Sequence, residues 1–152
     1  MERNEIKEQL KKLDTVYEKF TMTPEMFEIW VDCFKDADKK IFEQAIIETM
    51  QTEEYAPNIA TVNRHYKAIE AERKAVVDTA RGCYYELIDL LGEKKSADDY
   101  AALLQMIADY PRGERIEAIE DFRDKAASYA NKHRSDGTEM KSLAQLIKEY
   151  MG

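Results

Sequence analysis

The residues best suited to chemistry are four carboxylates in one short stretch, namely Glu117, Glu120, Asp121 and Asp124. Their spacings of three and four place them on one face of a helix. Such a face could hold magnesium for nucleotide hydrolysis, because hard cations prefer carboxylate oxygens. However, Arg115, Arg123 and Lys125 interleave with them, and no second acidic pair matches. The pattern therefore favours a solvated helix face over a metal site.

Other reactive residues do not assemble into a recognisable site. His65 and His133 lie far apart and neither neighbours a cysteine, so no zinc-ligand spacing is present. No glycine-rich phosphate loop or serine nucleophile elbow occurs. Cys33 and Cys83 fall on apolar stripes and are expected to be buried free thiols in a reducing compartment. The sequence predicts no enzyme, no metal and no cofactor.

Two surfaces are candidates for binding a partner. The first is an aromatic and cationic corner formed by Tyr129, Lys132, His133, Arg134 and Lys141. The second is a basic side of one helix, formed by Arg64, Lys67 and Arg73. A few aromatic anchors among exposed charges are typical of protein interfaces. For both surfaces, an ordinary solvated face is the alternative interpretation.

The elements that must position these residues are predicted from capping signals. Thr23 followed by proline predicts a helix start, because threonine caps free N–H groups and proline loses only an unpaired donor. Asp36 or Asp38 is expected to cap the next helix, and Asn58 the helix after that. Ser96 followed by Asp99 predicts a further start.

Apolar residues recur at three- and four-residue spacing, which predicts the buried faces of amphipathic helices. In the first half these are Ile6, Leu10, Leu13, Tyr17 and Phe20 in a helix from about Asn4 to Phe20, then Met26, Phe27, Trp30, Cys33 and Phe34, then Phe42, Ala45, Ile46, Thr49 and Met50. Trp30 is expected to be the central anchor of this core.

A fourth helix is expected to begin at Ile59. It runs unbroken to Gly92 or breaks within residues 70–74; Gly82 costs about 1 kcal/mol in a helix interior and is tolerable there. We therefore expect an all-α protein with a four-helix core in residues 1–72, joined, in the unbroken case by one long helix, to a second helical half in residues 73–152.

The second half carries its own helical pattern. After the residue 100–107 stripe, a Pro-Arg-Gly break precedes a long helix that residues 135–137 close. Thr138 is expected to cap a last helix carrying Met140, Leu143, Ile147 and Tyr150.

Six features follow one another in the first half: Phe20, Trp30, Asp36-Ala37-Asp38, Ala45-Ile46, Tyr55-Ala56-Pro57 and Ile59-Ala60. Their order and spacing resemble the N-terminal domain of the phage replicative-helicase loader/inhibitor family, over roughly residues 1–70. The family often has two prolines in the loop, where this chain has Ala56-Pro57. Its members continue into a poorly ordered, helicase-engaging tail, whereas residues 75–152 here have a folded helical pattern.

Charge and hydropathy limit the classes of protein to which the chain could belong. The net charge is −8, which argues against a general nucleic-acid coat because polyanions repel. No apolar run is long enough to span a bilayer, and the N-terminus lacks a signal-peptide core, so a cytoplasmic location is expected.

The resemblance implies a non-enzymatic phage DNA-replication protein that needs no cofactor. Such a protein would bind a DnaB-type replicative helicase and either control its activity or deliver it to a replisome organiser at the origin. Two alternatives remain: a helical module with a different phage or host partner, and a magnesium-dependent nucleotide pyrophosphohydrolase. Oligomeric state is left open by the sequence.

Overall fold

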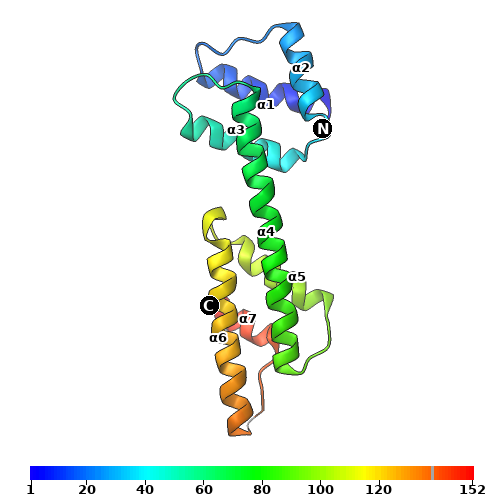
Figure 1. Ribbon diagram of the computed structural model, residues 1–152, viewed down its shortest axis with the longest axis vertical. Helices are drawn as coiled ribbons and strands as arrows, with labels where there is room; N and C mark the ends of the chain where they lie inside the picture. Colours follow the sequence, from blue (N-terminus) through cyan, green and yellow to red (C-terminus); the bar gives the residue numbers. More distant parts are fainter. Residues whose placement is uncertain (138) are drawn as a thin grey trace. The chain divides into compact units, whose positions relative to one another are not determined.

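The computed structural model describes residues 1–137 and 139–152. Over these residues the chain forms seven α-helices, one short 3-10 helix and no strand, which confirms the predicted all-α class (Figure 1). The elements are α1 (Arg3–Val16), α2 (Pro24–Phe34), α3 (Lys39–Thr52), α4 (Ile59–Leu91), α5 (Ala97–Ala108), η1 (Arg112–Glu114), α6 (Arg115–Asp136) and α7 (Leu143–Met151). None of the helices in this part of the chain combines the length and apolarity that crossing a membrane requires.

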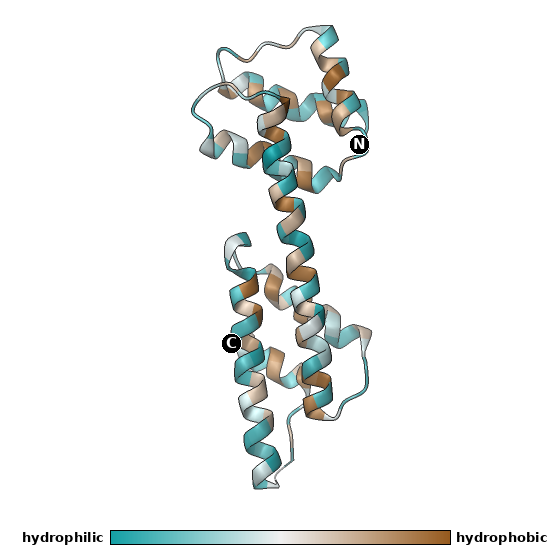
Figure 2. Ribbon diagram, viewed as in Figure 1, coloured by the Kyte–Doolittle hydropathy of each residue, from teal (hydrophilic) through white to brown (hydrophobic). Residues whose placement is uncertain are grey.

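The chain divides into two compact units, Met1–Glu72 and Arg73–Gly152. The boundary falls inside α4, which is one continuous helix of 33 residues and supplies side chains to both units. The break considered for residues 70–74 does not occur. Apolar residues recur between polar ones along this helix (Figure 2), so each unit receives an apolar face from it.

Local capping accounts for the helix starts in the first unit. The Thr23 hydroxyl accepts a hydrogen bond from the Met26 N–H, and the Asp38 carboxylate accepts one from the Ile41 N–H. The Asn58 side chain accepts from the Thr61 N–H. These three residues satisfy backbone donors that a helix leaves unpaired, as the sequence predicts.

The core of the first unit is aromatic. Trp30 is 2% exposed; its ring stacks on Phe34 at 5.8 Å between centroids and meets Phe20 edge-on at 6.3 Å. Phe42 and Tyr66 pack against the other sides of Phe34. Aromatic pairs in these geometries add to the stabilisation that burial alone provides. The predicted burial of Trp30 in the core is confirmed, and Phe34 is the ring that contacts Trp30, Phe42 and Tyr66.

Two tyrosine hydroxyls join elements of this unit. The Tyr17 hydroxyl donates toward the Thr49 and Glu53 carbonyl oxygens at 3.0 and 2.6 Å, which lie at the end of α3. The Tyr66 hydroxyl accepts the Asp38 N–H at 2.9 Å. Backbone groups that a helix end leaves unpaired are thereby satisfied.

The second unit packs α4, α5, α6 and α7 around one apolar cluster. Its fully buried side chains include Leu87, Leu103, Ile107, Ile119 and Phe122. The Tyr84 hydroxyl accepts the Ser96 N–H at 2.5 Å and so fixes the chain just before α5. Gly137 ends α6 with φ +66°, a left-handed conformation that glycine adopts readily.

Three predictions about local structure are wrong. α1 ends at Val16, short of Phe20, because Tyr17 turns to an extended conformation while its hydroxyl is held by α3. The last helix begins at Leu143 with Ser142 as its N-cap, so Met140 precedes it. The predicted cap, Thr138, lies outside the described residues.

The third error concerns α2, whose buried side chains are Trp30, Val31 and Phe34. At about 100° per residue, this arc turns Met26 and Cys33 away from the core. Both are exposed, and Cys33 is therefore not the buried thiol that the sequence predicts. Cys83 is buried as predicted.

Candidate functional site

The predicted aromatic and cationic corner forms at the end of α6. Tyr129 and His133, one turn apart, contact each other with ring centroids 4.0 Å apart and their planes tilted by 37°, and the Lys141 ammonium lies 5.6 Å from the Tyr129 centroid. The Tyr129 hydroxyl accepts the Lys141 N–H at 2.7 Å. An ammonium over an aromatic face is attracted by the ring quadrupole, so these three residues hold one another in place.

The other two corner residues behave differently. Arg134 donates from Nη2 to the Leu90 carbonyl oxygen at 2.8 Å, at the end of α4. Lys132 is exposed. Lys141 also pairs with Glu149 at 2.7 Å, which offsets its charge. The corner thus presents a tilted pair of aromatic rings beside three exposed cations, of which Arg134 and Lys141 have partners within the chain.

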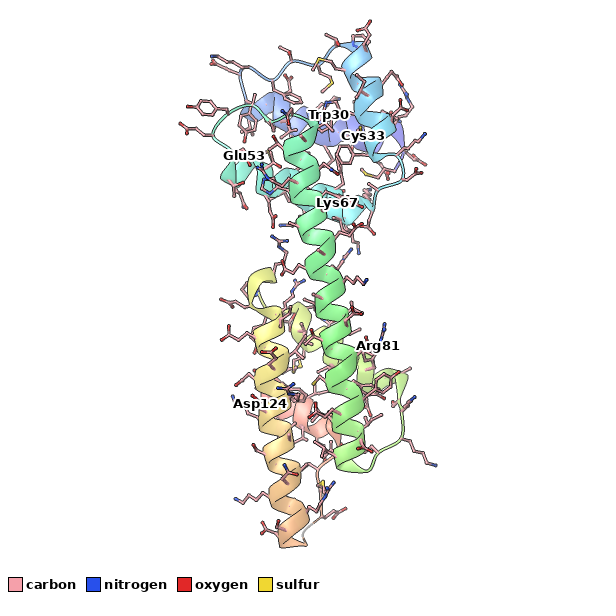
Figure 3. All side chains as sticks on the ribbon, in the orientation of Figure 1. Trp30, Cys33, Glu53, Lys67, Arg81 and Asp124 are labelled. Carbon is pink, nitrogen blue, oxygen red and sulfur yellow. The ribbon has the colours of Figure 1, made fainter. Side chains whose placement is uncertain are left out.

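The predicted basic side of α4 carries less net charge than its residues suggest. Arg64 pairs with Glu53 at 2.5 Å, and His65 Nε2 lies 3.2 Å from the same carboxylate. Figure 3 labels Glu53 and Lys67. Lys67 pairs with Glu70 at 3.6 Å. Arg73 is exposed and is the first residue of the second unit, whereas Arg64 and Lys67 belong to the first. Arg64 and Lys67 are thus each paired with a carboxylate of the first unit.

The four candidate magnesium ligands are exposed on α6. The nearest partners of Asp121 are the Tyr150 hydroxyl at 2.7 Å and the Lys125 ammonium at 3.1 Å. The hydrogen bond from Tyr150 and then that from Lys125 lower the pKa of Asp121. Asp124 pairs with Arg123 at 3.2 Å. These two carboxylates are occupied by cationic and hydroxyl partners of their own chain, and no group of three metal-ligating residues lies together in the described part of the chain.

A groove that sequence reasoning missed lies in the first unit, between α2 and the segment leading into α4. It encloses about 490 Å³ and is lined mainly by Met26, Ile29, Trp30, Pro57, Ile59 and Ala60. Ile29 is 54% exposed and Met26 is 39% exposed, although both are large and apolar. The available signal was the isoleucine one turn before Cys33, which extends the apolar face beyond the width that the core covers.

The first unit contains three capped helices, an aromatic core around Trp30 and a proline loop that leads into α4. Residues 1–63 match the family model of the phage helicase loader/inhibitor N-terminal domain. This match confirms the resemblance that the order and spacing of the six sequence features indicated. A search of curated proteins and a search of solved structures each found no match.

The family match covers the groove but not the predicted binding residues. Every residue lining the groove lies within residues 19–60. Arg64, Lys67, Arg73 and the whole corner at Tyr129 lie beyond residue 63. The matched family is of the phage helicase-associated type and is not a family of enzymes. The match therefore bears on the first unit and leaves the second to be interpreted from its own structure.

Proposed function

We propose that this protein is a non-enzymatic phage replication protein that binds a DnaB-type replicative helicase in the host cytoplasm. The observation that supports this is the match of residues 1–63 to the helicase loader/inhibitor N-terminal domain, on a unit whose fold has the predicted caps, core and proline loop. Binding would control the activity of the helicase or deliver the helicase to a replisome organiser at the origin. A protein acts in this way when it binds one helicase conformation more tightly than another.

The corner at the end of α6 is our candidate contact with the helicase. In the family, a tail following the domain has this role; here the chain after residue 72 is a packed helical unit. The ring pair of Tyr129 and His133 is half-buried, and Tyr129 is bonded to Lys141, so the pair offers a rigid aromatic anchor. Rigid anchors lose little conformational entropy on binding.

The test is a titration of purified DnaB-type helicase against the full-length protein. Lys132→Glu should weaken binding about tenfold, or about 1.4 kcal/mol, and the loss should shrink as salt rises. Lys12→Glu, an exposed lysine on α1, is the matched control. Absence of binding by the unaltered protein would refute the proposed function. Binding that Lys132→Glu leaves unchanged at low salt would remove only the corner, and Arg64, Lys67 and Arg73 would be reversed next.

A second measurement separates loading from inhibition. Helicase activity on a forked DNA is followed with and without the replisome organiser. A loader raises unwinding in the presence of the organiser, and an inhibitor lowers it in its absence. Pyrophosphate release from nucleoside triphosphates, measured with magnesium present, should not exceed the buffer rate if the protein acts by binding alone.

A further inference from the structure

The exposed face of α2 combines apolar and acidic residues in an ordered way. Met26, Ile29 and Cys33 follow one another at spacings of three and four, which places them in one row along the helix. All three are exposed. Single exposed apolar side chains are ordinary, whereas an exposed row that borders a cavity indicates an interaction surface.

The row has a cavity beside it. Met26 and Ile29 both line the groove of about 490 Å³, and the Trp30 ring, Pro57 and Ile59 form its apolar lining. The groove can therefore receive apolar side chains from a partner that lies along α2.

Carboxylates border the same row. Glu25 lies four residues before Ile29 and Asp32 three residues after it, so both are its neighbours on the helix surface. Glu28 on this helix pairs with Arg3, whose charge also acts on Asp32, and neither Glu25 nor Asp32 makes a salt bridge within residues 1–137 and 139–152. Lys19 is the cation among the groove residues. Residues 22–54 as a whole carry nine acidic residues against three lysines.

We propose that this groove binds a basic amphipathic α-helix of a partner protein. Its apolar side chains, spaced by three and four, would enter between Ile29 and Pro57, and its lysines or arginines would face Glu25 and Asp32. Helices bind in grooves through such a row of anchors, and complementary charge fixes their register. The proposal does not depend on helicase binding, because the groove and the corner at Tyr129 belong to different units.

The test uses the full-length protein as bait for a displayed library of helical peptides whose solvent positions are varied among lysine, glutamate, glutamine and leucine. Selected peptides should be amphipathic with a positive net charge, and their affinity should fall as salt rises. Ile29→Ser should weaken their binding at least tenfold, as loss of a central anchor does. Ile47→Ser is the matched control, since Ile47 is an exposed isoleucine on α3 away from the groove.

A charge variant tests the acidic border separately. Reversal of both carboxylates, Glu25→Lys with Asp32→Lys, should weaken the selected peptides about tenfold and shift a repeated selection towards acidic sequences. Circular dichroism of each variant should match the unaltered protein, because the changed residues are exposed.

Several outcomes would overturn the proposal. They are the selection of neutral or acidic peptides, binding that Ile29→Ser does not weaken, and failure to select any peptide. Self-association in sedimentation equilibrium that Ile29→Ser abolishes would show instead that a second copy of the chain occupies the groove.

Discussion

Arg134 on α6 donates its guanidinium N–H to the Leu90 carbonyl oxygen at 2.8 Å, in the last turn of α4. The last carbonyl groups of a helix have no partner within it, and a cationic donor there also offsets the negative end of the helix dipole. Arg134 therefore stabilises the end of α4 as well as contributing charge to the surface.

Arg134→Glu is expected to lower the free energy of unfolding by about 1 kcal/mol, since it removes this hydrogen bond and places a negative charge at a negative helix end. The neighbouring change Lys132→Glu should leave stability nearly unaltered, because exposed charges contribute little. Urea unfolding of both variants makes the comparison. Equal midpoints would show that the contact with Leu90 does not contribute.

Trp30→Ala is expected to destabilise the protein by about 3–5 kcal/mol, the range for removing a large buried aromatic. Trp30 is 2% exposed and contacts Phe20 and Phe34, so its loss leaves a cavity in the core of the first unit. Thermal unfolding followed by circular dichroism measures the effect. A melting temperature within a degree or two of the unaltered protein would contradict the anchor role.

The isolated fragment 1–72 is expected to fold. All the buried residues of its core cluster lie between Ile6 and Ile69, so the cut removes none of them. Circular dichroism should show a helical spectrum with a cooperative melt, as small single-core domains give. A random-coil spectrum would mean that the first core requires the remaining chain.

The two cysteines are expected to react at different rates. Cys33 is exposed, whereas Cys83 is 3% exposed. Burial raises the pKa of the Cys83 thiol to about 11, and the thiolate is the reactive form. Iodoacetamide at neutral pH should label Cys33 in the native protein and Cys83 only after unfolding. Rapid labelling of both would show that the second core opens readily.

The same group predicts a pH dependence of stability. The unfolded thiol has an ordinary pKa of 9.0, so the folded protein holds this proton more tightly. The resulting stabilisation is complete below pH 9 and is lost as pH rises through about 11. Cys83→Ala should therefore lose less stability than the unaltered protein between these values. Curves of unfolding free energy against pH that run parallel for the two proteins would contradict this role of Cys83.

Sequence reasoning correctly predicted the features that depend on interactions between residues close together in the chain. Each of four N-cap side chains accepts a hydrogen bond from the backbone N–H three residues later, so these caps can be predicted from local sequence. They are Thr23, Asp38, Asn58 and Ser96. The spacing of Ile6, Leu10 and Leu13 likewise predicts their burial. Such short-range signals determine most of the all-α fold.

Sequence reasoning failed for features that depend on packing between residues far apart in the chain. The rotation of α2 depends on which arc the core covers, so the sequence alone assigned Met26 and Cys33 to the wrong side and gave no groove. Arg134 donates a hydrogen bond to Leu90, 44 positions away, and Arg64 donates one to Glu53 on the other side of a loop. Composition showed the charges at the candidate sites but not which of them are already paired.

Trp30 is the only tryptophan of the chain, and it lies in the core of the first unit. Excitation that selects indole therefore reports on residues 1–72 alone, whereas far-ultraviolet circular dichroism sums the helices of both units. One unfolding experiment recorded in both channels thus yields two curves. The fluorescence curve gives the midpoint and slope for the first unit, and the part of the circular dichroism change that does not follow it gives those for the second, so both stabilities are obtained without a single cut or label.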